Sequence, residues 1–378
     1  MDELSKPRLK VLFYAVNGLG LGHLTRMMSL WQGFLHQQKY LIEPFFLTTS
    51  HASNLLCRYK IPYVQFPSKT AVSQNPTWGY RAIGRLYQAL VNDVYDQFRP
   101  HILIVDTLVL GSHFDLANLL RFGNAYKVYV HRARKQDAYD AGTIQAQRFY
   151  DLIIAPHYRG SEIIPLPIEH DIPLYWSGPL FFAGNPVSRP DVRNYLNARP
   201  DENIVLITLG GGGDTSNQEL FQEILRLITA LPNTKILLGR GPLDSQNLKI
   251  TSKNIIETNY FPLSEWYSGI DWAISAAGYN AFHELLHAGI ATIFIPRQRG
   301  LDDQYFRAKR AAESEAAFLV NPEQEIIPQL KNILPLIANP EVRKKICRNA
   351  QNYVPTNHTA DIAAEIIAQY TELQNTVN

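Results

Sequence analysis

The chain has 378 residues, of which 46% are hydrophobic and 19% are charged, and its formal net charge is +2 at pH 7. This is an ordinary globular composition, and the length exceeds the roughly 250–300 residues at which a single core stops growing, so we expect two domains. The two cysteines lie in different halves of the chain, which argues against a disulfide framework and for a reducing compartment. The sequence shows no signal-peptide pattern and no apolar run of about 18 residues, which favours a cytoplasmic protein.

The first half alternates short apolar runs with amphipathic stretches, a pattern typical of a doubly wound parallel sheet. We expect strands at residues 11–16, 40–48, 63–66, 102–106, 127–131 and 152–155, the last of which closes the series. Helices are expected at residues 24–35, 52–59, 83–98 and 116–120, with a long loop at 70–80.

The first apolar run ends in a glycine-rich loop, residues 17–23, that opens the first expected helix. Such a loop can bind anions, because backbone N–H groups and the positive end of the helix dipole point the same way. The dinucleotide fingerprint requires a glycine at its sixth position, where this chain has His23, so an NAD-type site is disfavoured. A histidine at the carboxyl end of the first strand can act as a general base, although it can also be a buried residue that caps the turn.

Three further polar residues lie where expected strands end. Asp106 ends one strand, and His131 and Arg132 end the next, so all three could face the same crevice as His23. Asp106 could equally cap the element that follows it.

The Pro- and Gly-rich residues 178–190 mark the boundary between the halves. We expect an N-terminal domain at 1–180, a linker at 181–190, a C-terminal domain at 191–356 and a terminal helix at 357–378 that can pack back on the N-terminal domain. The second half repeats the opening theme, with a strand at 204–209, a glycine loop at 210–216 and a helix at 219–231. Strands are expected at 235–239, 272–275 and 291–296, and helices at 263–267, 303–317 and 361–373. The sequence therefore predicts an α/β protein with two Rossmann-like domains that face a central cleft.

Residues 275–304 carry a second small-residue turn, at Gly278, at the start of a helix. This turn can hold a phosphate, and the Glu284 carboxylate, less than two helical turns on, could accept hydrogen bonds from sugar hydroxyls. The same helix reads His-Glu-Leu-Leu-His at 283–287, the pattern of zinc hydrolases. A catalytic zinc needs a third protein ligand, and the sequence offers no His-rich extension, so we disfavour the metal site.

Residues 18–26, Gly-Leu-Gly-Leu-Gly-His-Leu-Thr-Arg, resemble the loop that opens GT-B glycosyltransferases, and the motifs at 275–304 resemble the sugar-nucleotide motif of glycosyltransferase family 28. The loop is similar to the Gly-Leu-Gly-His-x-x-Arg loop of a MurG-like group of predicted bacterial glycosyltransferases. The resemblance implies a GT-B fold that binds a nucleoside-diphosphate sugar, UDP-linked, mainly through the C-terminal domain, with no metal or other cofactor.

The resemblance also implies roles for individual residues. Glu284 would bind the ribose hydroxyls, Asp303 and Gln304 would hold the sugar, and His23 would lie near the reacting centre. In the mechanism that we expect, Asp106 assists His23 in activating the acceptor hydroxyl. The remaining donor-binding residues would be Gly20, Gly22, Gly211, Gly212, Gly213, Ser275, Gly278, Tyr279 and Asn280. On the acceptor side we place Arg26, His131 and Arg132. Two departures, Tyr279 in place of a small residue and the loop at 210–215, leave the sugar and base preference open.

We expect a glycosyltransferase that moves a hexose or N-acetylhexosamine to an acceptor with inversion. A nucleotide-sugar hydrolase or epimerase of the same fold, and a non-catalytic binding subunit of a membrane glycosyltransferase, are the alternatives. The acceptor is unidentified, with lipid-linked and cell-envelope molecules included, and no nucleic acid is expected. A modestly basic first half favours an anionic acceptor or the inner face of the membrane, although an ordinary solvated surface explains it equally.

Overall fold

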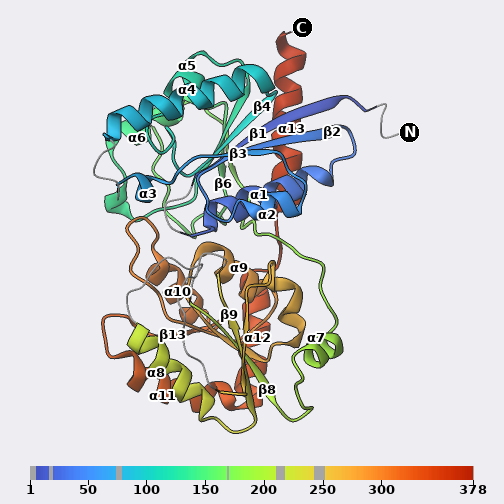
Figure 1. The fold of residues 1–378 in the computed structure, drawn as a ribbon, viewed down its shortest axis with the longest axis vertical. Coiled ribbons are helices and arrows are strands. Elements are labelled where there is room, and N and C mark those ends of the chain that lie inside the picture. Colours follow the sequence, from blue (N-terminus) through green and yellow to red (C-terminus); the bar gives the residue numbers. More distant parts are fainter. Residues whose placement is uncertain are drawn as a thin grey trace. The chain divides into compact units, whose positions relative to one another are not determined.

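The computed structural model describes residues 6–16, 20–73, 79–167, 170–209, 218–241 and 252–377. The chain divides into two compact units, and the polypeptide passes from the first to the second and back. The first unit comprises Met1–Phe181 with Asn357–Asn378, and the second comprises Phe182–Thr356 (Figure 1). Each unit is a parallel sheet covered by helices, so each has its own hydrophobic core.

The sheet of the first unit has, within the described residues, seven strands in the order β3-β2-β1-β4-β5-β6-β7. Every neighbouring pair is parallel. The strands are β1 (Arg8–Ala15), β2 (Leu41–Thr48), β3 (Tyr63–Gln65), β4 (Ile102–Asp106), β5 (Tyr126–Val130), β6 (Leu152–Ala155) and β7 (Leu174–Trp176). The strand order reverses between β1 and β4, which makes the carboxyl ends of these two strands the place where open α/β sheets bind ligands.

The helices of the first unit are α1 (Gly22–Leu35), α2 (Asn54–Arg58), α3 (Lys69–Ser73), α4 (Tyr80–Phe98), α5 (Ala117–Phe122), α6 (Ala141–Ala146) and α13 (Thr359–Val377), with short 3-10 helices η2 (Gln136–Ala138) and η3 (Gln147–Phe149). Two expectations are wrong here. The stretch 70–80 is not one loop, because α3 covers its start and α4 begins at its end. The strand series does not close at residue 155, because β7 pairs with β6.

Helix α13 lies against α1, so the end of the chain belongs to the first unit (Figure 1). A glycine makes this close approach possible: a Cβ at Gly33 would lie 2.2 Å from the carbonyl oxygen of Thr359. The Gln37 side-chain amide donates to the carbonyl of Ala360 at 3.3 Å, and Ile362 and Ile366 are fully buried.

The sheet of the second unit has six strands in the described part of the chain, in the order β10-β9-β8-β11-β12-β13, all parallel. They are β8 (Asn203–Thr208), β9 (Thr234–Gly239), β10 (Ile255–Thr258), β11 (Trp272–Ser275), β12 (Thr292–Phe294) and β13 (Phe318–Leu319). The helices are α7 (Arg189–Tyr195), α8 (Gln218–Thr229), η4 (Leu263–Gly269), α9 (Tyr279–His287), α10 (Gln304–Glu313), α11 (Ile326–Ala338) and α12 (Pro340–Tyr353).

The prediction of two parallel-sheet α/β domains is confirmed. The helix expected at 303–317 is shorter than predicted, because α10 ends at Glu313 and the chain turns through Glu315, at φ 51°, into β13. None of the helices in the described ranges is long and apolar enough to cross a membrane.

Candidate functional site

The loop after β1 leads directly into α1, and its described part begins at Gly20. Gly20 has φ +104°, a conformation that favours glycine, and Gly22 is the first residue of α1. A Cβ at either position would meet no atom of the described residues within 4 Å. Leu21, the N-cap residue of α1, has no polar side chain, so the backbone N–H groups at the start of this helix suit an anion.

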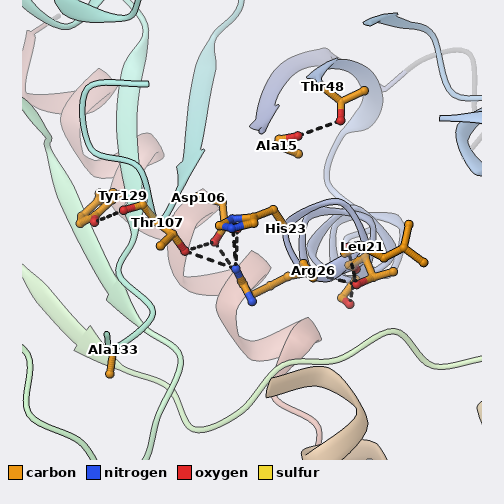
Figure 2. Close-up of polar contacts among 12 residues, drawn as sticks. Ala15, Leu21, His23, Arg26, Thr48, Asp106, Thr107, Tyr129 and Ala133 are labelled. Carbon is orange, nitrogen blue, oxygen red and sulfur yellow. Dashed lines mark hydrogen bonds and ion pairs between the residues drawn. The ribbon is translucent and has the colours of Figure 1, made fainter. Parts of the chain in front are cut away.

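The first turns of α1 carry His23 and Arg26, and both side chains meet Asp106 at the carboxyl end of β4 (Figure 2). The distance from His23 Nδ1 to Asp106 Oδ2 is 2.7 Å. Arg26 Nε donates to Asp106 Oδ1 at 2.9 Å, and Arg26 Nη2 donates to Oδ2 at 2.6 Å. The predicted neighbours His23 and Asp106 are therefore brought together, and Arg26 joins them.

The hydrogen-bond partners fix the tautomer of His23. An ionised carboxylate only accepts hydrogen bonds, so Nδ1 carries the proton that is donated to Asp106. The lone pair then lies on Nε2, the atom that can take a proton from a substrate. The His23 side chain is 20% exposed, whereas that of Asp106 is fully buried.

The charges around this pair set both protonation states. Burial raises the pKa of Asp106, but the Arg26 guanidinium and His23, through charge and hydrogen bonds, outweigh burial and hold this pKa well below its usual range. Burial lowers the pKa of His23; Asp106 opposes this effect, and the charges of Arg26 and Arg132 add to it. At neutral pH the site therefore holds a carboxylate and a neutral imidazole.

The backbone after β4 is held in an unusual conformation. Thr107 has φ +62°, in the left-handed region that a β-branched residue rarely adopts, at a cost of about 1–3 kcal/mol. Its N–H donates to the carbonyl of Val130 at 3.0 Å, and its own carbonyl accepts from the Tyr129 hydroxyl at 2.7 Å. The Thr107 hydroxyl accepts from Arg26 Nη2 at 3.3 Å and donates to Asp106 Oδ1 at 3.2 Å. These bonds orient the Asp106 carboxylate.

The structure places the two residues after β5 inside the fold. His131 is fully buried, with Nε2 3.3 Å from the Tyr139 hydroxyl, and burial lowers the pKa of His131 to about 3. Arg132 is 6% exposed, and its charge contributes to the lowered pKa of His23. Arg132 thus acts on the electrostatics of the His23 site, while His131 packs against Tyr139.

In the second unit, β11 runs through a short loop into α9. Gly278 is the N-cap residue of α9, and a glycine has no side chain to cover the start of the helix, as suits an anion-binding helix start. The Ser275 side chain is fully buried and donates to the carbonyl of Ala276 at 2.9 Å, so it stabilises the loop. Tyr279 is 5% exposed and packs against His283, and Asn280 is partly buried.

The loop before α10 lies beside the start of α9: a Cβ at Gly278 would be 3.8 Å from the Gln304 amide nitrogen. The same amide donates to Asp302 Oδ2 at 3.3 Å, and its oxygen accepts from the Arg297 N–H at 3.0 Å. Asp303 accepts from the Phe306 N–H at 3.0 Å and is the N-cap of α10.

Arg307, in α10, was not predicted from the sequence. Its Nη1 donates to the carbonyl of Ala277 at 2.7 Å, and its Nη2 donates to Asp302 Oδ1 at 3.0 Å. The residue is 5% exposed, so its buried side chain links the loop that precedes α9 to the loop that precedes α10. The sequence does contain a clue to this role: Arg307 lies one helical turn after Gln304, so its side chain can lean back toward the loop that precedes α10.

Glu284 lies on α9 in a partly buried position, and the Tyr267 hydroxyl is 3.4 Å from its Oε2. Burial raises the pKa of Glu284 to about 7, and the contact with Tyr267 opposes this rise only in part. Additional hydrogen-bond donors would stabilise the ionised form of this carboxyl group more than its protonated form. Gly211, Gly212 and Gly213, the other predicted donor residues, lie outside the described residues.

The two histidines of the zinc-like motif both contact backbone carbonyls. His283 Nδ1 is 2.7 Å from the carbonyl oxygen of Tyr279, and His287 Nδ1 is 3.0 Å from that of Val354. No group of three or more His, Cys, Asp or Glu side chains within the described ranges is placed to hold a metal ion. These contacts give both histidines a role in fixing α9.

Residues 204–366 match the glycosyltransferase family 28 C-terminal domain. The chain is 27% identical over 177 residues to the UDP-N-acetylglucosamine--N-acetylmuramyl-(pentapeptide) pyrophosphoryl-undecaprenol N-acetylglucosamine transferase of Carboxydothermus hydrogenoformans, covering 45% of this chain and 47% of that protein. The protein of the same name from Aquifex aeolicus is 28% identical over 167 residues, covering 43% of this chain and 46% of that protein. The chain therefore spans about half the length of the curated relatives it matches.

Solved structures resemble the whole chain. The MurG of Acinetobacter baumannii has a TM-score of 0.62 at 16% identity, covering 95% of this chain and 99% of that chain. The spinosyn forosaminyltransferase SpnP has a TM-score of 0.68 at 12% identity, covering 96% of this chain and 99% of that chain. At this level of identity the likeness shows the fold, which is that of GT-B glycosyltransferases.

Proposed function

We propose that this protein is a MurG-like glycosyltransferase, because residues 204–366 match the glycosyltransferase family 28 C-terminal domain and the chain has the GT-B fold. The reaction moves a hexose or N-acetylhexosamine from a nucleoside-diphosphate sugar, UDP-linked, to an acceptor hydroxyl. The observation that carries the proposal is the contact between His23 Nδ1 and Asp106 at the carboxyl ends of β1 and β4, because it supplies an oriented general base.

The proposed chemistry is a single displacement at the anomeric carbon. His23 Nε2 takes the proton of the acceptor hydroxyl as the acceptor oxygen bonds to the anomeric carbon. The bond from that carbon to the diphosphate oxygen breaks, and the nucleoside diphosphate leaves with the electron pair. One displacement inverts the configuration, and the Asp106 carboxylate stabilises the imidazolium that forms.

The second unit supplies the donor-binding groups in this proposal. The start of α9 at Gly278 would face the diphosphate, where backbone N–H groups and the helix dipole stabilise the leaving group without a metal ion. Glu284 would accept hydrogen bonds from the ribose hydroxyls. Asp303, which caps α10 through one oxygen, and Gln304, whose amide lies next to Gly278, would hold the sugar.

The relatives are named for an acceptor that carries pyrophosphoryl-undecaprenol, and a lipid-linked or cell-envelope acceptor is the corresponding proposal here. Such an acceptor would bring the protein to the inner face of the membrane. The test of the acceptor is transfer of radiolabelled sugar to the lipid fraction of a cell-envelope extract.

Two variants test the division of labour between the units. Donor binding is measured by thermal shift against a panel of nucleoside-diphosphate sugars, since a ligand of the folded state stabilises it by mass action. We expect Glu284→Gln to lose most of the UDP-sugar stabilisation, and His23→Gln to keep it but lose sugar transfer. Glu313→Gln and His36→Gln, at exposed positions on α10 and at the end of α1, are the matched controls.

Other outcomes would contradict the proposal in distinct ways. Release of free sugar from UDP-sugar without an acceptor would indicate the hydrolase alternative. UDP-sugar binding with no turnover against any acceptor extract would indicate a non-catalytic binding subunit. Unchanged UDP-sugar affinity in Glu284→Gln would refute the donor-site assignment itself.

A further inference from the structure

The guanidinium of Arg26, on α1, is buried inside the protein, which is unusual for a residue expected to contact an acceptor. The residue is 1% exposed and is the largest of the fully buried side chains. We propose that Arg26 is a positioning residue for the general base: its guanidinium holds the Asp106 carboxylate ionised and in plane, so that Asp106 orients a neutral His23. This inference rests on the proposed function, in which His23 Nε2 accepts the acceptor proton.

The two oxygens of the Asp106 carboxylate have different hydrogen-bond partners. Asp106 Oδ1 accepts from Arg26 Nε and from the Thr107 hydroxyl, and it meets no bond from His23. Asp106 Oδ2 accepts from both His23 Nδ1 and Arg26 Nη2. A guanidinium that contacts both oxygens fixes the plane of a carboxylate, and this plane then sets the direction in which Oδ2 can accept from the imidazole.

The helical spacing explains why one side chain can do this. His23 and Arg26 are three residues apart on α1, so they project from the same face of the helix. Side chains on a helix lean toward its N-terminus, which here is the end next to the carboxyl edge of the sheet. The longer arginine therefore reaches past the histidine to the same aspartate on β4 (Figure 2).

Three charged residues act on His23: Asp106 on β4, Arg26 on α1 and Arg132 after β5. The Tyr129 hydroxyl of β5 donates to the carbonyl of Thr107, the residue next to Asp106. Burial is the main cause of the lowered pKa of His23, and the Arg26 charge adds to it against the opposing effect of Asp106. Arg26 also pairs with the Asp106 carboxylate, so this carboxylate can orient the imidazole while the imidazole stays neutral at neutral pH.

The alternative role for Arg26, direct contact with the acceptor, requires an accessible guanidinium. Its side chain is 2% exposed; Nε donates to Asp106, and Nη2 contacts Asp106, Thr107 and, at 3.4 Å, His23 Nδ1. A substitution that removed an acceptor contact would raise the KM for the acceptor without changing the titration of His23. A positioning role predicts the reverse, with a lower kcat, little change in KM and a changed titration of His23.

The test is a histidine titration followed by NMR in protein labelled with 15N in its imidazole rings. His23 is assigned among the eleven histidines by the signal that disappears in His23→Gln. In the wild type we expect the Nδ1-protonated tautomer and a midpoint below the usual histidine range. In Arg26→Gln the coupled His23–Asp106 pair takes up its first proton at a higher pH than in the wild type. Arg121→Gln, at an exposed position in α5, is the control and leaves the midpoint unchanged.

Arg26→Lys keeps the test decisive if Arg26→Gln does not fold. Lysine retains the charge but cannot contact both oxygens in one plane, so the midpoint should stay near the wild-type value while kcat falls about 10- to 100-fold. An unchanged midpoint in folded Arg26→Gln, or wild-type kcat in Arg26→Lys, would overturn the proposal. The titration needs no substrate. Failure of the wild type to transfer sugar would therefore refute the proposed function and leave the role of Arg26 at the imidazole intact.

Discussion

Glu284 should make the affinity for UDP rise with pH while the stability of the unliganded protein falls. Burial raises the pKa of this carboxyl from 4.5 to about 7. The folded protein therefore binds a proton more tightly than the unfolded chain does, and this stabilising contribution is complete at pH values below 4.5. It is lost as the pH rises through about 7, where the folded protein must hold a buried carboxylate with few donors.

The size of both effects follows from the shift. A difference of about 2.5 pH units corresponds to at most about 3 kcal/mol in the free energy of unfolding, lost between about pH 4.5 and pH 8. If UDP binds the ionised form, the bound ribose hydroxyls supply the donors that the carboxylate lacks. About one tenth of the Glu284 carboxyls are ionised at pH 6 and about nine tenths at pH 8, so the affinity should rise about tenfold.

The assay is isothermal titration calorimetry with UDP at pH 6, 7 and 8, together with urea unfolding of the unliganded protein at the same pH values. Phosphate groups also titrate near pH 6, so uridine, which lacks them, is the control ligand. Glu284→Gln should bind weakly at every pH and should be more stable than the wild type at pH 8. A UDP affinity that is independent of pH in the wild type, or a pH dependence that persists in Glu284→Gln, would refute the reasoning.

Three further outcomes are expected from the site. Asp106→Asn removes the carboxylate that fixes the His23 tautomer, and steady-state kinetics should show kcat lower by about 10³- to 10⁴-fold with UDP affinity unchanged; weaker UDP binding would contradict the assignment. Arg307→Lys keeps the charge but not both contacts, so calorimetry should show UDP binding about tenfold weaker, with wild-type affinity as the contrary result. Treatment with EDTA should leave sugar transfer unchanged, and activity restored only by added Mg²⁺ would contradict a leaving group stabilised by α9 alone.

Strands buried on both faces were the most predictable elements. The continuous apolar runs at 102–106, 152–155 and 272–275 coincide with β4, β6 and β11 residue for residue. The missed strands β7, β10 and β13 are three, four and two residues long, and none of their residues is fully buried. Their pairing with β6, β9 and β12 is tertiary, and periodicity within a short segment does not report it.

The positions of the site residues were predictable, but their contacts were not. The rule that ligands meet the carboxyl ends of parallel strands identified His23 after β1 and Asp106 at the end of β4. Whether the two side chains touch depends on the adjacency of β1 and β4, which are separated in the described sequence by two strands and four helices. The role of Arg26 depends on the same adjacency, so the sequence alone placed Arg26 only on the acceptor side.

The two buried arginines show a common physical logic in the two units. Arg26 lies three residues after His23, and Arg307 three residues after Gln304, each near the start of a helix that follows a strand of the parallel sheet. Each guanidinium points back to the carboxyl edge of the sheet, Arg26 to Asp106 on β4 and Arg307 to the carbonyl of Ala277 after β11. In both units the guanidinium of an arginine on the next helix thus holds the functional loop. Side chains lean toward helix N-termini, and arginine combines that reach with donors in a planar fork, which lysine lacks. An arginine at this spacing behind a loop motif therefore indicates a support for the site before it indicates a contact with the substrate.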